Sequence, residues 1–216
     1  MNQTPSKIKG ARAEETKQRI LRAAGELFEE RGYQSVTMRE IAKQAGCSHT
    51  AIYMHCKDKE DLLHQLVIPP LTEFKDEAQE LLRSGYEPRK VLVQMSMNWM
   101  TFCLKYRSIA SVLITMKSER VDHAEPELRL NQLRLDIYRT LEEILIANLP
   151  GKVTAEQRLT CSRIYFYMLM GIVHTYIDNE EGTQVLMERL TPIIEAAMDV
   201  LIAGMIQQFT GEEEII

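Results

Sequence analysis

The sequence has few of the features that mark β structure or an oxidising compartment. Glycine accounts for only 10 of the 216 residues, and no stretch of strand length alternates between apolar and polar residues. The four cysteines form no C-x-x-C pair. A chain of this length does not need disulfides for stability, so the cysteine pattern fits a reducing cytoplasm. These absences predict an all-α cytoplasmic protein.

Long apolar runs are also scarce. The polar start Met-Asn-Gln-Thr-Pro is not followed by the apolar segment of a secretory signal. The longest mostly apolar run, from Ile164 to Ile177, is shorter than the roughly 20 residues that a membrane span requires. We therefore expect a buried helix over this run and no membrane partner.

Catalytic motifs are missing as well. The sequence shows no serine, histidine and aspartate order of a hydrolase, no glycine-rich phosphate loop and no paired carboxylates at a telling spacing. We expect no catalytic residue, no cofactor and no metal. An all-helical enzyme, or an adaptor whose short helices bind protein, remains the alternative to the interpretation that follows.

The charge is small overall but unevenly distributed. The net charge is −5, which argues against a protein that coats nucleic acid along its whole surface. Residues 1–60 nevertheless hold 11 Lys and Arg against 8 Asp and Glu, whereas residues 61–216 hold 15 against 23. A mildly basic head on an acidic body indicates an anionic partner for the head alone.

That head contains the most informative pattern, two short capped helices joined by a glycine turn. Thr37 and Glu40 have the spacing of a capping box, in which each side chain satisfies a free backbone N–H. The first helix should end at Ala45, Gly46 allows a tight turn, and Ser48 can cap the second helix. This is the pattern of a helix-turn-helix, which places its second helix in the major groove of DNA.

The second helix of the pair should bury Ile52 and expose a polar face. That face would carry Ser48, His49, Thr50, Ala51, Tyr53 and His55, which are short or flat groups suited to base edges and phosphates. Lys57 and Lys59 follow at once and are placed for the DNA backbone. A small capped helix with a solvated face is the plainer alternative.

Longer helices are predicted around this unit. A loose basic arm is expected over residues 1–12 and a first helix over 13–31, ending at Gly32. A helix from Asp58 towards Leu82 should kink or break at Pro69-Pro70. Further helices are expected from Pro88, over about 109–117, from about 130 to 149, from Thr154 to about 178 and from Thr191 to about 208, with linkers at 122–126 and 179–182.

Four consecutive segments of the sequence form a known signature, namely Thr37-Met38-Arg39-Glu40-Ile41-Ala42, Ala45-Gly46-Cys47-Ser48, Ile52-Tyr53-Met54-His55 and Lys57-Asp58-Lys59-Glu60-Asp61-Leu62-Leu63. With these segments the sequence resembles, over about residues 15–65, the tetracycline-repressor-like (TetR) family of transcriptional regulators. The resemblance has several implications. It implies a helix-turn-helix domain over residues 1–60 and a larger effector-binding and dimerisation domain over 61–216, with about nine helices in all. It further implies an obligate homodimer, a double-stranded DNA operator and a small-molecule effector.

The resemblance also assigns roles to single residues. Thr37, Tyr53, His55 and Lys59 match family positions that hold phosphates, and Arg39, Ser48, His49 and Thr50 match positions that face bases. Two residues depart from the family pattern. Cys56 stands where a large apolar residue is usual, so the support under the second short helix is expected to be looser, and Cys47 stands where valine is common.

The cysteines and histidines of this segment also allow a zinc site or a redox switch. Zinc is disfavoured because His49 and His55 should face the groove while Cys47 and Cys56 turn inward, so that they could not share an ion. Oxidation of Cys47 or Cys56 would disturb the helix above them and stays open. A lone buried cysteine is more often an ordinary core residue.

In the C-terminal part, two sets of residues are candidates for an effector pocket and a dimer interface. The pocket would take a small apolar or amphipathic effector, although ordinary core packing is the better assignment for any single member. The predicted pocket residues are Trp99, Phe102, Tyr106, Tyr138, Tyr165, Met168 and His174. The predicted interface residues are Ile172, Tyr176, Ile194, Met198, Leu201, Ile202 and Met205, as in a four-helix interface with two helices from each subunit.

Overall fold

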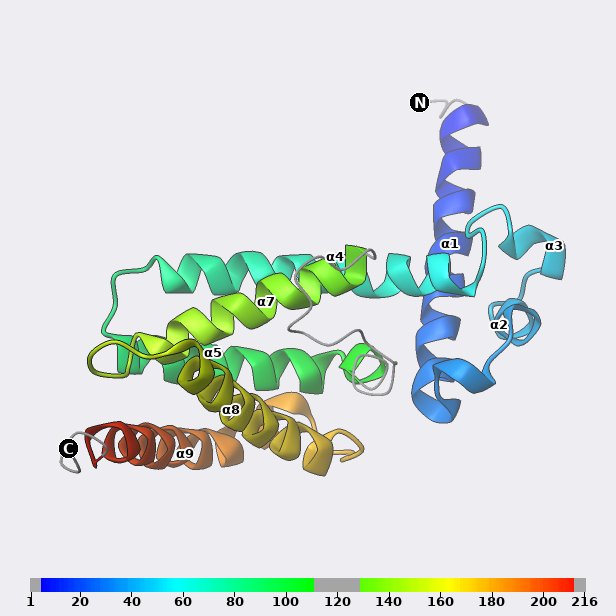
Figure 1. Ribbon diagram of the computed structural model, residues 1–216. Helices are drawn as coiled ribbons and strands as arrows, with labels where there is room; N and C mark the ends of the chain where they lie inside the picture. The colour runs from blue at the N-terminus through cyan, green and yellow to red at the C-terminus, as the bar shows by residue number, and fades with distance from the viewer. Residues whose placement is uncertain (1–4, 111–128, 212–216) are drawn as a thin grey trace, which may run out of the picture. The chain divides into compact units, whose positions relative to one another are not determined.

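A computed structural model describes residues 5–110 and 129–211 of the chain (Figure 1). Helices make up most of the described residues and no strand occurs among them, which confirms the all-α prediction. The described residues form two compact units, one of residues 5–71 and 107–110 and the other of 72–106 and 129–211. The functional boundary expected between residues 60 and 61 stays a prediction.

The N-terminal unit is built on a long first helix. It contains α1 (Pro5–Arg31), the 3-10 turn η1 (Tyr33–Ser35), α2 (Met38–Gln44), α3 (His49–Ile52) and the start of α4 (Lys59–Leu82). α1 packs on α2, which packs on α3. The core side chains Phe28, Ile41, Ile52 and Leu63 have no measurable exposure. Buried apolar residues from all four α-helices therefore hold the two short helices in place.

The predicted loose arm is partly wrong, because α1 already begins at Pro5. Proline is favoured at the first position of a helix, where its missing N–H would have no intrahelical partner. The residues that follow are mostly good helix formers such as Lys, Ala, Arg and Glu. Only residues 1–4 of the expected arm lie outside the described part of the chain.

The caps predicted in the helix-turn-helix are confirmed. The Thr37 hydroxyl accepts from the Glu40 N–H at 3.3 Å, and the Glu40 carboxylate accepts from the Thr37 N–H at 2.9 Å. The Ser48 hydroxyl accepts from the Ala51 N–H at 3.0 Å. Gly46 has a φ of +65°, the left-handed region that a glycine adopts without strain. Local side-chain chemistry thus sets the bounds of α2 and α3.

The break predicted in α4 is absent, because the helix runs from Lys59 to Leu82 through Pro69 and Pro70. Each proline removes one backbone donor, which ordinarily ends or bends a helix. Val67, Leu71 and Phe74 flank the prolines and are each at most 3% exposed. Their burial offsets the missing hydrogen bonds, so tertiary packing overrides the local preference.

The C-terminal unit is a bundle arranged around α5. Its helices are the end of α4, α5 (Pro88–Lys105), α7 (Arg129–Ile146), α8 (Ala155–Tyr176) and α9 (Thr183–Gly211). α5 packs against α7, α8 and α9, and α7 packs against α8 (Figure 1). Residues 107–110 are helical, and the remainder of the helix expected to about 117 and the linker at 122–126 lie outside the described residues.

The last helix starts earlier than expected. α9 begins at Thr183, eight residues before the predicted start, and includes Pro192 within its length. Leu186 and Leu190 precede the proline and are at most 1% exposed, as is Ile194 beyond it. The buried face is therefore continuous across Pro192, which explains why the helix does not stop there.

A buried polar cluster lies where α5, α8 and α9 meet. The Ser96 hydroxyl contacts the Leu92 carbonyl at 2.8 Å, the Tyr165 hydroxyl at 2.9 Å and the Met198 sulfur at 3.3 Å. Tyr165 is 1% exposed, and burial raises the pKa of its hydroxyl well above the ordinary value of 10.0. Because an unpaired hydroxyl in this core would be costly, the contact fixes how α8 packs on α5.

Replacing Tyr165 with Phe should lower the free energy of unfolding by about 1 kcal/mol, because Ser96 loses a buried hydrogen-bond partner. Urea unfolding followed by circular dichroism measures this change. The matched control is Tyr86→Phe, because Tyr86 is 59% exposed. Equal losses in both variants would contradict the role assigned to the buried contact.

Stability at acid pH should depend on Glu40. Hydrogen bonds from the Thr37 side chain and backbone, followed by the contact with Arg31 at 2.8 Å, lower the Glu40 pKa from 4.5 to about 2. A carboxyl group whose pKa is lower in the folded state adds stability above its unfolded pKa, and this stability is lost as the pH falls through the folded pKa.

The advantage of the native protein over Glu40→Gln should accordingly be full above pH 4.5 and vanish towards pH 2. Gln keeps the capping geometry, so the comparison isolates the charge. Urea midpoints measured across this range, with Glu29→Gln on α1 as control, test the expectation. A difference that does not vary with pH would exclude it.

Candidate nucleic-acid interface

The face predicted to read DNA is exposed around the four-residue helix α3. Ser48, His49, Thr50 and Tyr53 are all exposed, while Ile52 on the opposite side is completely buried. Tyr53 follows the last residue of α3 and is 47% exposed. The structure therefore brings the predicted base-facing residues of α3 and the phosphate candidate Tyr53 onto one solvent-facing surface.

Two aromatic side chains shape this surface. The rings of His49 and Tyr53 lie 5.3 Å apart at 87°, an edge-to-face contact across one helical turn. Such a contact restricts the rotamers of both residues before any ligand arrives. His49 and Tyr53 are thus held as one unit on the exposed side of α3.

The two hydroxyl groups at the helix caps differ in what they can offer a ligand. The Ser48 oxygen accepts the Ala51 N–H, which leaves its hydroxyl hydrogen to donate to a base or phosphate. The Thr37 hydroxyl donates to a Glu40 oxygen at 2.7 Å, and the Thr37 N–H donates to the same oxygen. A phosphate held by Thr37 would have to replace a bond of the capping box.

The other predicted contacts lie on α2 and beyond the end of α3. Arg39 on α2 and Lys57 beyond α3 are exposed, and His55 is half-buried. Helix α4 fixes the main chain at His55 and Lys57. The Lys57 N–H donates to Asp61 at 2.8 Å, and the His55 carbonyl accepts from Gln65 at 3.0 Å. The exposed side chains of Arg39 and Lys57 carry positive charge.

Lys59 does not fit its predicted role as a phosphate contact. Its ammonium donates to the carbonyls of Tyr33 at 2.9 Å, Val36 at 3.0 Å and Gln34 at 3.4 Å. It also lies 4.4 Å from the centre of the Tyr33 ring. An ammonium has three hydrogens, so these carbonyls occupy its donors. The sequence could not indicate this, because the partners lie more than twenty residues away.

Met54 is an exposed residue that the sequence interpretation left out. Its side chain is 83% exposed and directly follows Tyr53 at the end of α3. Apolar groups can contact thymine methyl groups in the major groove. The signal that could have identified Met54 is its place in a short polar segment away from the buried Ile52.

The cysteines beneath α3 occupy two environments. Cys56 is buried, its thiol donates to the Ile52 carbonyl at 3.3 Å, and burial raises its pKa to about 11. Cys47 is half-buried, whereas His49 is exposed. A thiol with a raised pKa is a poor nucleophile at neutral pH, which supports a packing role for Cys56.

The residues predicted to line an effector pocket do not all gather in the core. Trp99, Phe102 and Tyr165 are buried, and Tyr106, Tyr138 and Met168 are half-buried. His174 is exposed on α8, so its assignment to an enclosed pocket is corrected. The sequence shows an apolar run on α8, but it does not reveal that one side of this helix, which includes His174, faces solvent.

The pocket candidates on α5 form an aromatic cluster. The Trp99 and Phe102 rings stack at 5.9 Å, Phe74 contacts both, and Tyr106 lies 5.2 Å from Phe102. The buried indole N–H of Trp99 has no hydrogen-bond partner in the described part of the chain. A buried donor without a partner is costly, and a ligand acceptor would remove that cost.

The predicted interface residues fall into two groups by their exposure. Ile194, Met198 and Met205 are at most 4% exposed, because they face the core of their own protomer. This corrects their assignment to a dimer interface. Ile172, Tyr176, Leu201 and Ile202 are half-buried. Spacing along α9 identifies an apolar face but cannot say which of two apolar faces turns outward.

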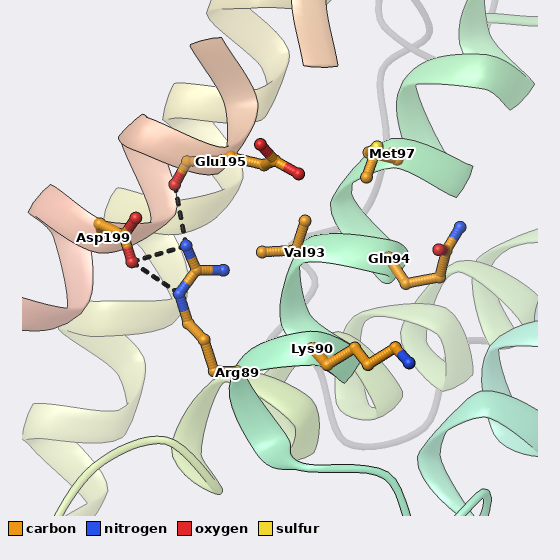
Figure 2. Close-up of a pocket in the computed structure, with 7 residues that line it drawn as sticks. All are labelled: Arg89, Lys90, Val93, Gln94, Met97, Glu195 and Asp199. Carbon is orange, nitrogen blue, oxygen red and sulfur yellow. Dashed lines mark hydrogen bonds and ion pairs between the residues drawn. The ribbon is translucent and has the colours of Figure 1, made fainter. Parts of the chain in front are cut away.

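A surface groove of about 370 Å³ lies between α5 and α9 (Figure 2). Arg89 reaches across from α5 and donates to Asp199 at 2.8 Å and to the Glu195 carbonyl at 3.0 Å. The lining residues are Arg89, Lys90, Val93, Gln94, Met97, Glu195 and Asp199, which include none of the predicted pocket residues. The groove is charged, and Arg89 is already neutralised by Asp199.

Comparison with known proteins agrees with the helix-turn-helix. Residues 20–66 match the family model described as bacterial regulatory proteins, tetR family. The HTH-type transcriptional repressor BepR of Brucella suis biovar 1 (strain 1330) is 27% identical over 180 residues, covering 80% of this chain and 85% of that protein. An HTH-type transcriptional regulator of Staphylococcus aureus (strain USA300) is 31% identical over 88 residues, which are 41% of this chain and 47% of that protein.

A solved structure shares the fold over most of the chain. The transcriptional regulator FadR from Bacillus subtilis, crystallised in complex with stearoyl-CoA, superposes with a TM-score of 0.64 at 19% identity and covers 87% of this chain and 98% of its own. The capped helix α3 with its exposed polar face agrees with the matching family model. Residues 20–66 of the chain are a helix-turn-helix segment of the tetR family of bacterial regulatory proteins, and the chain is similar to HTH-type transcriptional regulators.

Proposed function

We propose that this protein is a cytoplasmic homodimeric repressor that leaves its operator when a small effector binds the C-terminal unit. The single observation that carries the DNA-binding part is the exposed polar surface of α3, held from below by the buried Ile52. Two such helices in a dimer would enter successive major grooves of a pseudo-palindromic operator. The name of BepR, a repressor, supports repression in place of activation.

Residue roles follow from the chemistry of the surface. Ser48, His49, Thr50 and Arg39 are assigned to base edges because they are exposed and polar. Tyr53, His55 and Lys57 are assigned to phosphates at the edge of the surface, and Thr37 would join them by giving up a capping bond. Lys59 is withdrawn from this set.

Exposed apolar side chains on α8 and α9 support the homodimer. On α8, Ile164 is 44% and Tyr167 is 64% exposed, and the two lie on one face of the helix. On α9, Val185, Ile193 and Val200 are 56%, 50% and 74% exposed and form a second apolar face, away from the buried one. A second copy of the same two faces would cover them in a four-helix interface.

The apolar character of α9 is also compatible with a membrane span, but the charged residues within the helix argue against one. Over Thr183–Gln208 this helix is long and apolar enough to cross a bilayer by length and composition, with 22% of the tested window buried. Glu195 and Asp199 lie inside this segment, and Arg89 donates to the Asp199 carboxylate and to the main-chain carbonyl of Glu195. Charged groups in the middle of a span are expensive, so a protein partner suits this helix better.

The aromatic cluster around Trp99 supports an apolar or amphipathic effector. Stacked rings offer apolar contact, and the unpaired indole N–H offers one donor to an oxygen or nitrogen of the ligand. The B. subtilis FadR structure contains stearoyl-CoA, an amphipathic molecule, in a related fold. An effector can release the operator only through a higher affinity for the conformation that does not bind DNA.

Replacing His49 or Thr50 with Ala should change which DNA sequence the protein prefers. Loss of a good base contact costs about 1–3 kcal/mol of discrimination at one position of the operator. Selection from randomised duplexes, followed by titration of the selected sequences, measures the change. Lys57→Met is the control, because loss of a phosphate contact should weaken binding to all sequences alike. An unchanged preference in both alanine variants would refute the assignment of base contacts.

Replacing Val200 with Asp should dissociate the dimer, because it buries a charge in the interface. Sedimentation equilibrium should show at least about a tenfold increase in the dimer dissociation constant, which corresponds to about 1.4 kcal/mol. Gln184→Asp adds the same charge on the polar side of α9 and should leave the dimer intact. Dissociation by both changes, or by neither, would argue against this face.

A further inference from the structure

The start of α4 holds the main chain on both sides of the helix-turn-helix. Before α2, the Lys59 ammonium binds the carbonyls of Tyr33, Gln34 and Val36. After α3, the Asp61 carboxylate accepts the Lys57 N–H, and the Gln65 amide donates to the His55 carbonyl. Each contact ends on a backbone atom, so it fixes the path of the chain regardless of the side chains there.

The position of Lys59 is unusual for its charge. It is the first residue of α4, where the helix dipole disfavours a cation. The side chain turns away from this end towards the 3-10 turn η1, whose last carbonyls lack helical partners. The face of the Tyr33 ring, 4.4 Å from the ammonium, adds a cation–π contact. The local cost is therefore offset by contacts with a distant segment.

The electrostatics of the two partners are consistent with a partly desolvated contact. Burial lowers the pKa of Lys59 from its ordinary value. Burial, and then the nearby carboxylates of Glu60 and Asp58, raise the pKa of the Tyr33 hydroxyl. Glu60 and Asp58 are the charged groups that flank Lys59 on the chain. The ammonium binds carbonyl oxygens in place of water.

We propose that Lys59 is a positioning residue for DNA recognition and contacts no phosphate. Together with Asp61 and Gln65 it forms an α4 clamp, which holds the segment before α2 and the segment after α3 to one rigid helix start. The α4 clamp thereby presents the exposed polar face of α3 at one fixed angle to the major groove of DNA. Specific binding needs this angle, whereas non-specific binding to phosphates depends mainly on the exposed cations.

The test compares three variants of the full-length protein. Lys59→Met removes the ammonium and keeps the apolar stem. Lys59→Arg keeps the charge but presents a planar fork, which cannot direct three donors at these carbonyls from one nitrogen. Lys57→Met is the matched control, because it removes an exposed cation two residues away. The probes are a duplex selected by the native protein from randomised DNA and a scrambled duplex of equal length.

Each variant is titrated with both duplexes over a range of salt concentrations. For Lys59→Met and Lys59→Arg we expect the ratio of specific to non-specific affinity to fall by about tenfold or more, with the salt slope of non-specific binding unchanged. For Lys57→Met we expect the slope to decrease by about 0.9, the effect of one lost phosphate contact on B-DNA, with the ratio preserved.

Two results would overturn the proposal. If Lys59→Met lowers the salt slope by about 0.9 while Lys59→Arg binds like the native protein, Lys59 is a phosphate contact. If the affinities of the Lys59 variants for the selected and the scrambled duplex fall in equal proportion, Lys59 contributes only to stability. If neither affinity changes, Lys59 has no role in DNA binding. Circular dichroism establishes the folded fraction. Should Lys59→Met fail to fold, Gln65→Ala tests the other side of the α4 clamp with the same two expected readouts.

The inference rests on the proposed binding of an operator. Selection of DNA by the native protein distinguishes a failure of the proposed function from a failure of the α4 clamp. If the native protein selects no sequence from randomised DNA, the proposed function is wrong and the variants are not compared. If it selects an operator and the ratio for the Lys59 variants stays at the native value, the proposed function stands and the α4 clamp is refuted.

Discussion

The helix-turn-helix of α2 and α3 depends on hydrogen bonds to the free backbone N–H groups at the ends of these two very short helices. α2 has seven residues and α3 has four, lengths at which a helix is not stable by itself in water. Thr37, Glu40 and Ser48 satisfy N–H groups at their N-terminal ends, and Ile41 and Ile52 anchor them in the core. Without both contributions there would be no ordered surface on which His49 and Thr50 could face DNA.

Polar contacts from the neighbouring helices extend this dependence to the rest of the N-terminal unit. Arg31 at the end of α1 pairs with Glu40 at 2.8 Å, and Gln44 on α2 donates to Glu26 on α1 at 2.9 Å. α4 contributes the bonds from Lys59 and Gln65 to main-chain carbonyls. Exposed ion pairs are individually weak, so their value here lies in orientation more than in stability.

The C-terminal unit meets a different constraint, because α8 and α9 are apolar on more of their surface than one protomer can bury. One face of α9 contains Leu186, Leu190 and Ile194 and is fully buried. The other contains Ile193 and Val200 and is exposed. A helix with two apolar faces can bury one face in its own protomer and place the other against a second copy. The homodimer proposed above assigns one face to each.

The sequence by itself determined the features that depend on residues close together along the chain. The capping box at Thr37, the turn at Gly46 and the cap at Ser48 all follow from spacings of a few residues. Tertiary structure alone decided the rest. Packing carries α4 through Pro69 and Pro70, and carbonyls more than twenty residues away bind the Lys59 ammonium. Such outcomes depend on free energies of burial and on distant partners, which no local pattern encodes.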